Sequence, residues 1–222
     1  MPENTAKYNK HVWRYTRTLC AICFHGNEHK YMTHYGLGKI RDAFLGRSRL
    51  KRKMYTTHKI PNVEAFRHVA RWYLTEGNRL EFNEMQNRLS VLSKADRQKY
   101  MSREHADAEQ SHKLMVANDY LMLLPRAGIM AYDFAWHIYL CQIGHAVGYL
   151  SKPEALAKIV HAATSLQQNY NSWHEFYTAF MAGHRFVHND THLHKGERLM
   201  AYMLTHPSSP ARKLDWQTKL IV

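Results

Sequence analysis

The region from Gly128 to Phe186 constrains the fold most, because it places helix-start signals in front of two segments with apolar stripes. Ser151 is followed three residues later by Glu154, and Ser172 is followed in the same way by Glu175. A serine at the N-cap with a glutamate three positions later satisfies backbone donors that the first helical turn leaves unpaired. The two pairs therefore predict helices that begin near residues 152 and 173.

Apolar side chains also recur at helical spacing just before these two helices. One stripe contains Met130, Phe134, Ile138 and Cys141, and a second contains Asp133, Trp136, Leu140, Gly144 and Val147. A helix that is apolar on two sides is buried between other elements of a domain. We therefore expect this helix to lie in the middle of the fold.

Similar spacing predicts helices in most of the remaining chain. They cover residues 8–22, 61–77 and 80–92, a long polar helix over residues 93–117, and a last helix capped by Asp190 and Thr191. Four glycines among the basic residues 26–60 predict a loop or an irregular linker there. No segment has the strict alternation of a half-buried strand, so the expected fold class is all-α.

These segments divide the chain into three parts. Residues 1–60 hold a basic helix and linker, residues 61–206 form a helical core domain, and residues 207–222 form a C-terminal tail. Tails of this kind are commonly poorly ordered, so we expect this one to lie on the surface or to be mobile. With 45% apolar residues among 222, the chain can bury a core.

The composition favours a cytoplasmic protein that does not cross a membrane. No apolar run approaches the ~20 residues that span a bilayer, and the first residues lack the apolar stretch of a signal peptide. The three cysteines, Cys20, Cys23 and Cys141, are a poor disulfide framework because their number is odd. No phosphate-binding loop, nucleophile elbow or H-E-x-x-H motif occurs, so no cofactor is predicted.

Positive charge is concentrated in the N-terminal quarter. The formal net charge is +13, and residues 1–60 hold 13 Lys and Arg against only three acidic residues. The densest run contains Arg47, Arg49, Lys51, Arg52 and Lys53. Such a run is either a solvated connecting segment or a patch that binds a nucleic acid or an acidic partner.

Asp133 is the strongest candidate for a functional side chain. A carboxylate inside an apolar helix is costly to bury unless it is paired, and its natural partners are Arg79, Arg185 and His137. One interpretation is a buried bridge to an arginine that fixes the helix register. The other is a cleft in which Asp133 acts as a general base while His137 and Arg185 hold an anionic substrate.

The 17 histidines raise the question of a metal site. His184 and His188 would share one helix face, and Asp190 and His192 could supply further ligands. The polar residues around Asp190 predict a break in the helix, so these four side chains need not converge. We therefore assign no metal and expect a polar surface with scattered histidines.

Five short pieces of sequence carry a resemblance to a known family: ARWYLTEGNRLEF, MAYDFAWHI, AVGYLSKPEA, NSWHEF and GHRF. In this order they resemble the bacterial domain-of-unknown-function family 1266, over residues 63–92 and 128–190. The matching positions are Trp72, Gly77, Arg79, Asp133, Gly148, Tyr149, Glu154, Ala155, Ser172, Trp173, Gly183 and Arg185. The chain departs from the pattern after Asp133, where Phe134-Ala135-Trp136 replaces a small residue followed by arginine, and at Val187, which replaces an aromatic residue.

The resemblance implies a bacterial cytoplasmic accessory protein and supplies no activity. We expect a non-enzymatic module that binds another protein, by analogy with immunity or chaperone-linked partners, through the polar residues 93–117 and the basic segment. Two alternatives stay open. One is nucleic-acid binding through residues 39–59, and the other is an enzyme or toxin-like effector centred on Asp133, His137 and Arg185.

Overall fold

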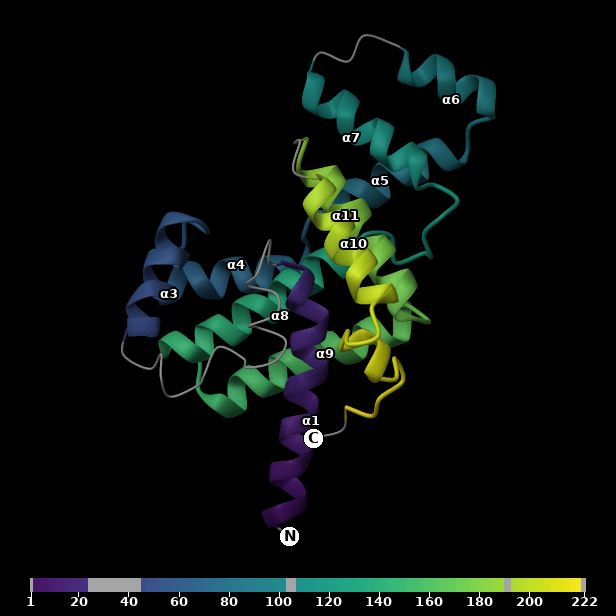
Figure 1. The fold of residues 1–222 in the computed structure, drawn as a ribbon. Helices are drawn as coiled ribbons and strands as arrows, with labels where there is room; N and C mark the ends of the chain where they lie inside the picture. Colours follow the sequence, from purple (N-terminus) through teal and green to yellow (C-terminus); the bar gives the residue numbers. More distant parts are fainter. Residues whose placement is uncertain (1, 24–44, 103–106, 190–192, 221–222) are drawn as a thin grey trace.

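The computed structural model describes residues 2–23, 45–102, 107–189 and 193–220. Every regular element in these ranges is a helix, which confirms the all-α prediction (Figure 1). The helices are α1 (Pro2–Cys20), η1 (Ala21–Cys23), α3 (Leu45–Thr56), α4 (Val63–Thr75), α5 (Arg79–Ser90), α6 (Lys94–Met101), α7 (Ala108–Asp119), α8 (Met130–Val147), α9 (Lys152–Asn169), α10 (Trp173–Val187), α11 (Leu193–Thr205) and η3 (Ala211–Lys213). None of these helices has both the length and the apolar character that crossing a bilayer requires.

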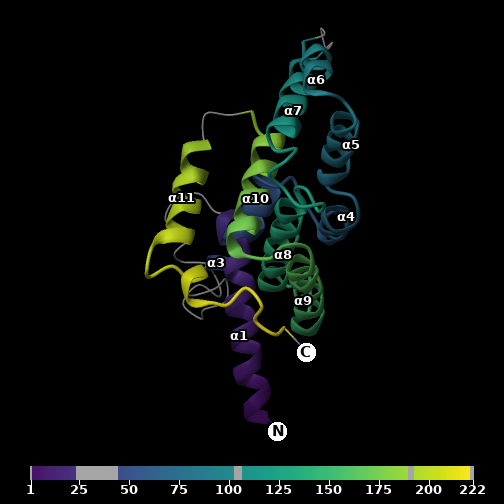
Figure 2. The same ribbon diagram turned by 90° about the vertical axis from the view of Figure 1, so that its right-hand side faces the viewer.

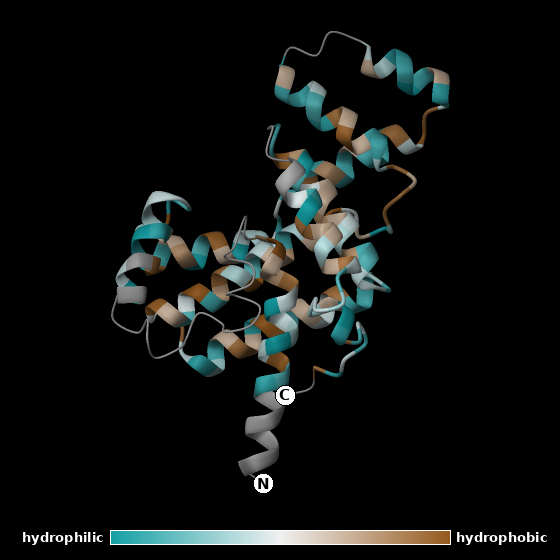
Figure 3. Cartoon of the chain, in the orientation of Figure 1, coloured by the Kyte–Doolittle hydropathy of each residue, from teal (hydrophilic) through white to brown (hydrophobic). Residues whose placement is uncertain are grey.

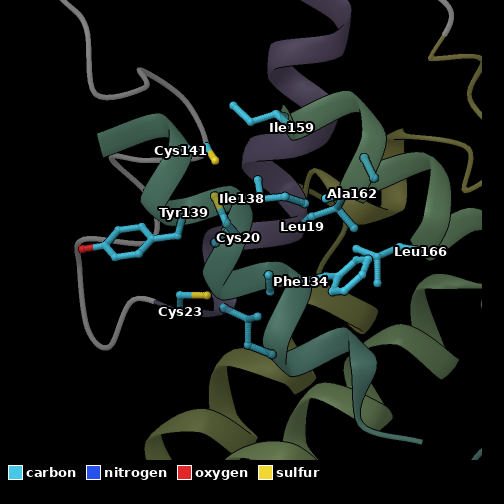
Figure 4. Packing of buried hydrophobic residues seen from close by; sticks show 14 of the residues in the cluster. Leu19, Cys20, Cys23, Phe134, Ile138, Tyr139, Cys141, Ile159, Ala162 and Leu166 are labelled. Carbon is cyan, nitrogen blue, oxygen red and sulfur yellow. The ribbon is translucent and has the colours of Figure 1, made fainter. Parts of the chain in front are cut away.

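Helix α8 lies at the centre of the molecule, as its two apolar stripes predict. Helices α1, α3, α4, α9 and α10 all pack against it (Figures 1 and 2). Figure 4 shows its Phe134 and Ile138 packed beside Leu19 of α1 and Leu166 of α9. Because 14 of its 18 residues are buried, every other part of the core is positioned relative to this helix.

The helix starts follow the predicted capping pattern with one difference. Ser151 and Glu154 form the complete reciprocal box at the start of α9. At the start of α10 the Ser172 hydroxyl accepts from the backbone N–H of Glu175, but the Glu175 carboxylate accepts from the backbone N–H of Asn171, at 2.8 Å. The second cap therefore reaches one residue further back along the chain.

The start of α8 is capped by a side chain from another part of the chain. The hydroxyl of Tyr170 accepts from the backbone N–H of Ala131 at 2.9 Å and donates to the carbonyl of Gly128, also at 2.9 Å. Tyr170 is fully buried and lies just after α9. This contact holds the first turn of α8 against the α9–α10 connection.

The single long helix predicted for residues 93–117 is wrong, because two helices stand in its place. Helix α6 starts after the N-cap Ser93 and ends at Met101, and α7 starts after the N-cap Asp107. The residues between them, 103–106, lie outside the described part. The Asp107 side chain accepts from the backbone N–H of Glu109 and so begins a new helix. In the sequence, Asp107 stands among other charged residues that are equally compatible with one continuous helix. Its role as an N-cap therefore could not be recognised.

The irregular linker predicted for residues 26–60 is wrong for its last part, where residues 45–56 form α3. Residues 24–44 lie outside the described part. Met54 and Ile60 are buried in the core, and the Nε2 atom of His58 lies 3.3 Å from the Tyr139 hydroxyl. Packing on α8, rather than the polar sequence of α3, therefore holds this helix in place.

The C-terminal tail is part of the core, which corrects the expectation of a surface or mobile segment. Trp216 is buried, and its indole N–H donates to the Tyr170 carbonyl at 2.7 Å. Its own carbonyl accepts from the Tyr15 hydroxyl at 2.8 Å and from Nε2 of Gln167 at 2.6 Å. The tail thus joins α1 to the end of α9. Helical periodicity could not detect it, because its buried apolar residues are not spaced as in a helix.

We predict that Trp216→Ala lowers the free energy of unfolding by about 3–5 kcal/mol, the usual cost of removing a buried aromatic ring. Urea unfolding followed by circular dichroism measures this change. The neighbouring Gln217 is exposed, so Gln217→Ala should change stability by less than about 0.5 kcal/mol. Equal effects of the two substitutions would show that the tail does not contribute to the core.

Candidate functional site

The Asp133 carboxylate binds the corner between α4 and α5. Asp133 lies in the first turn of α8 and is fully buried. One carboxylate oxygen, Oδ1, accepts from the backbone N–H of Asn78 at 3.0 Å and from its Nδ2 at 2.9 Å. The other, Oδ2, accepts from the backbone N–H of Arg79 at 3.0 Å and from its Nη1 at 3.3 Å. The carboxylate therefore caps the start of α5, where Asn78 makes no capping bond with its own side chain.

The Arg79 guanidinium links this carboxylate to the end of α4. Its Nη1 donates to the Tyr73 carbonyl at 2.8 Å, and its Nη2 donates to the Leu74 carbonyl at 2.7 Å. These carbonyls belong to the last turn of α4, which has no helical partners for them. The guanidinium carbon also lies 5.2 Å from the centre of the Phe134 ring. Arg79 thus supplies the positive charge beside Asp133. Its guanidinium also lies over the ring of Phe134, the residue that follows Asp133 on α8.

Gly77 makes the corner possible. Its φ of +64° is in the left-handed region that side chains disfavour, and a Cβ at this position would overlap the Asp133 carboxylate. The backbone can therefore turn from α4 into α5 directly against Asp133 only with glycine here. Gly77, Asn78, Arg79 and Asp133 form one unit, which we call the Asp133 junction.

At the Asp133 junction, the buried carboxylate is stabilised by the hydrogen bonds that it accepts and by the positive charge beside it. Burial raises the pKa of Asp133, while the hydrogen bonds from Asn78 and Arg79 and the Arg79 charge act in the opposite direction. All four contacts of the carboxylate are to groups of the same chain. This arrangement corresponds to the bridge between helices that the sequence offered as one interpretation of Asp133.

His137 forms a separate buried pair one turn further along α8. Its Nδ1 lies 2.7 Å from the Ala70 carbonyl, which can only accept, so Nδ1 carries the proton. Its Nε2 lies 3.4 Å from Sγ of Cys141. Burial lowers the pKa of His137 to about 4 and raises the pKa of Cys141 to about 12. The pair is therefore neutral at neutral pH, and the thiol remains protonated.

Arg185 lies in the last turn of α10, near α7, and has different partners again. Its Nη1 donates to the Tyr120 hydroxyl at 3.4 Å, and its guanidinium carbon lies 5.7 Å from the centre of the Tyr120 ring. Among the described residues, no hydrogen bond or ion pair joins Arg185 or His137 to Asp133. Of the three partners considered for Asp133, the structure brings only Arg79 to it.

The weak metal candidates are only partly described. His184 lies in the last turn of α10 and His188 directly follows the helix, with their ring centres 4.9 Å apart, and Nε2 of His188 lies 3.1 Å from the Tyr132 hydroxyl. Asp190 and His192 lie outside the described residues. Over the part of the chain that is described, no three potential ligands come together as a metal site.

The remaining residues that carry the family resemblance end helices or pack between them. Gly148 ends α8 with a φ of +85°, and Tyr149 packs on Phe66 with ring centres 5.7 Å apart. Trp72 contacts Tyr73, Ser172 caps α10, Trp173 is buried, and Gly183 allows α10 to approach Tyr132 closely. Their roles in the described structure are therefore architectural.

Sequence reasoning missed Asn78, which gives Asp133 two of its four donors. The residue stands inside the piece ARWYLTEGNRLEF, between Gly77 and Arg79. A glycine followed by asparagine at a helix start is a signal for a tight corner. It does not reveal which distant acidic residue binds the exposed backbone donors, because that depends on how α8 packs.

The basic run lies on α3, where the structure separates its members. Arg47, Lys51 and Arg52 are exposed, whereas Lys53 is half-buried. The side chain of Arg49 lies outside the described part. The Nε of Arg47 donates to the Ala146 carbonyl in the last turn of α8, at 3.0 Å.

A family model described as "protein of unknown function (DUF1266)" matches residues 53–216. The chain therefore belongs to the DUF1266 family, as its sequence pieces indicated. The match contains the Asp133 junction and reaches Trp216 in the tail, whereas α1 and most of α3 precede it. Neither the comparison with curated proteins nor the comparison with solved structures gives a match.

We predict that Asp133→Asn lowers the free energy of unfolding by about 3 kcal/mol, because it leaves Arg79 without its counter-charge and turns an amide group toward hydrogen-bond donors. Chemical denaturation measures the change. Glu84→Gln is the matched control, since Glu84 forms an exposed pair with Arg88 at 3.7 Å, and it should cost less than about 0.5 kcal/mol. A loss below 1 kcal/mol for Asp133→Asn would contradict the role of the junction.

We predict that the protein loses stability as the pH falls from about 6.5 toward 4. His137 has a pKa of about 4 in the folded state against 6.5 as its ordinary value, so the unfolded state binds a proton that the folded state excludes. Stability is therefore fully present above pH 6.5, and His137 alone removes about 2 kcal/mol by pH 5. Urea midpoints at pH 7.5 and 5.0 measure this difference, and His137→Gln should reduce it. An unchanged pH dependence in this variant would refute the assignment.

Proposed function

We propose that this DUF1266 protein is a non-enzymatic accessory module that binds another protein through its arm, which we define as residues 80–126. The arm holds nearly all of α5, with α6, α7 and the turn that follows, and it extends from the body at the top of Figure 1. In this proposal the protein acts in the bacterial cytoplasm beside a partner, in a setting such as immunity or chaperone activity.

The observation that carries the proposal is the gathering of exposed apolar side chains on the arm. In the described part of the chain, six large apolar side chains are exposed, and five of them belong to the arm: Leu80, Val91, Met115, Met122 and Leu123. Met122 is 88% exposed and Leu123 is 67% exposed, in the turn between α7 and α8 that Figure 3 shows in brown. Exposed apolar side chains that adjoin one another, as those of Met122 and Leu123 do in the sequence, mark surfaces that bind proteins.

The charge of the arm favours a protein partner over a polyanion. The arm contains seven Lys and Arg residues and seven Asp and Glu residues, so its formal net charge is zero. The rest of the chain carries the whole formal charge of +13. An apolar surface bordered by charges of both signs has the composition of a protein–protein interface with a polar rim.

The arm is held in a defined position before any partner binds. The Nζ of Lys113 on α7 bonds the Glu81 carboxylate of α5 at 3.0 Å and that of Glu109 at 2.8 Å. Nε2 of His112 lies 2.7 Å from the Arg185 carbonyl of α10. A small core that includes Phe82 and residues of α7 and α10 lies beneath these contacts. A preformed surface loses less conformational entropy on binding, which favours a recognition role.

The contacts of the candidate catalytic residues also favour binding over an enzyme or toxin-like activity. The Asp133 carboxylate is buried and holds two helices together. His137 is a neutral buried side chain, and Arg185 binds Tyr120 near the arm. Asp133 and His137 are both buried and engaged with their own chain, so neither presents an acid or a base to a substrate.

We predict that Met122→Asp with Leu123→Asp abolishes capture of the partner. The full-length protein is immobilised and exposed to nuclease-treated lysate of its native cells, and bound proteins are identified and quantified. Wild-type protein should retain one partner in stoichiometric amount. The double variant should retain less than about a tenth of it, because two buried charges without partners are costly at an apolar interface.

Arg212→Ala with Lys213→Ala serves as the matched control, since it changes two exposed residues on η3, outside the arm and α3. This control should capture as much partner as wild type. Circular dichroism and melting temperatures establish that all three proteins are folded. Capture that is unaffected by the arm substitutions, or lost equally in both double variants, would refute the proposed surface.

A further inference from the structure

Helix α3 presents a basic face that also contains an aromatic ring. Lys51 and Tyr55 are four residues apart and so lie on the same side of the helix, with Arg52 beside them. Tyr55 is 63% exposed and is the one large apolar side chain exposed outside the arm in the described part of the chain. The sequence of α3 contains no acidic residue.

The opposite side of α3 fixes this face on the body. Met54 is fully buried and Leu50 packs against the core. Arg47 bonds the Ala146 carbonyl in the last turn of α8, where the partial negative charge of a helix end favours a cation. The exposed residues of α3 therefore stand on a helix whose orientation is set by α8, and not on a loose connecting segment.

The charges on this face have no counter-charge within the described structure. Over the residues described, no acidic side chain forms an ion pair with Lys51 or Arg52, which are both exposed. Beyond the end of the helix, Lys59 adds another exposed ammonium group. Two cations and a tyrosine ring on α3, and a third cation three residues beyond its end, are thus available to a ligand.

We propose that α3 is a second binding surface, independent of the arm, that takes a single-stranded nucleic acid. Lys51, Arg52 and Lys59 would bind phosphate groups, and the ring of Tyr55 would stack on a base. Stacking on an exposed aromatic ring requires a base that is not already stacked within a duplex, and this favours a single strand. A lipid surface would use the charges but would offer no base to the ring.

This surface straddles the start of the family match. The family model begins at residue 53, so Lys51 and Arg52 precede it, and only Tyr55 and Lys59 fall within it. The arm lies entirely within the match. The two surfaces have no residue in common, so nucleic-acid binding by α3 neither requires nor excludes the protein-binding function proposed for the arm.

The test is fluorescence anisotropy of a labelled 15-nucleotide single strand with the full-length protein at several salt concentrations. Three neutralised phosphates predict an affinity about 20-fold lower at 200 mM salt than at 50 mM. Lys51→Ala with Arg52→Ala should reduce the slope of log affinity against log salt by about 1.4. Tyr55→Ala should weaken binding by about tenfold, whereas Tyr55→Phe, which keeps the ring, should bind as wild type does.

Arg212→Ala with Lys213→Ala is the matched control, because it removes two exposed positive charges from η3, outside both proposed surfaces. It should leave the affinity within about twofold of wild type, as net charge alone is not the cause. Equal losses in the two double variants would overturn the proposal. So would equal affinity of Tyr55→Ala and wild type for the single strand, or stronger binding to vesicles rich in phosphatidylserine than to the oligonucleotide.

Discussion

The four hydrogen bonds accepted by the Asp133 carboxylate determine how the arm leaves the body of the protein. Two of them come from backbone N–H groups at the start of α5, and the Arg79 side chain extends the network to the last carbonyls of α4. Backbone groups cannot change position without moving their helices. The junction therefore fixes the directions of α4, α5 and α8 together, and Gly77 is needed because the carboxylate occupies the space of a side chain.

This junction separates two surfaces of different chemistry. The arm beyond it exposes five large apolar side chains and has no formal net charge, whereas α3 is basic and lies against the other end of α8 (Figure 1). Both views place α3 and the far end of the arm apart from each other (Figure 2). A protein partner on the arm and an anionic ligand on α3 would consequently not compete for space, so one molecule could hold both.

The elements that sequence reasoning predicted are those whose signals are local. The stripes of α8 and the Ser151 cap depend on residues within a few positions of each other, and both are confirmed. The tail and α3 were misjudged because their order comes from packing: Trp216 binds residues far away in the sequence, and Met54 is buried against other helices. At the site, the charge of Asp133 identified an important position, but only the fold could select Arg79 over Arg185 and add Asn78.

Hydrogen exchange of individual backbone amides in wild type and Asp133→Asn tests the role of the junction most directly. We predict that Asn78, Arg79 and the first turns of α5 exchange about 100-fold faster in the variant, corresponding to about 3 kcal/mol of lost protection. Unchanged exchange at Asn78 and Arg79 would contradict the claim that Asp133 holds the arm to the body.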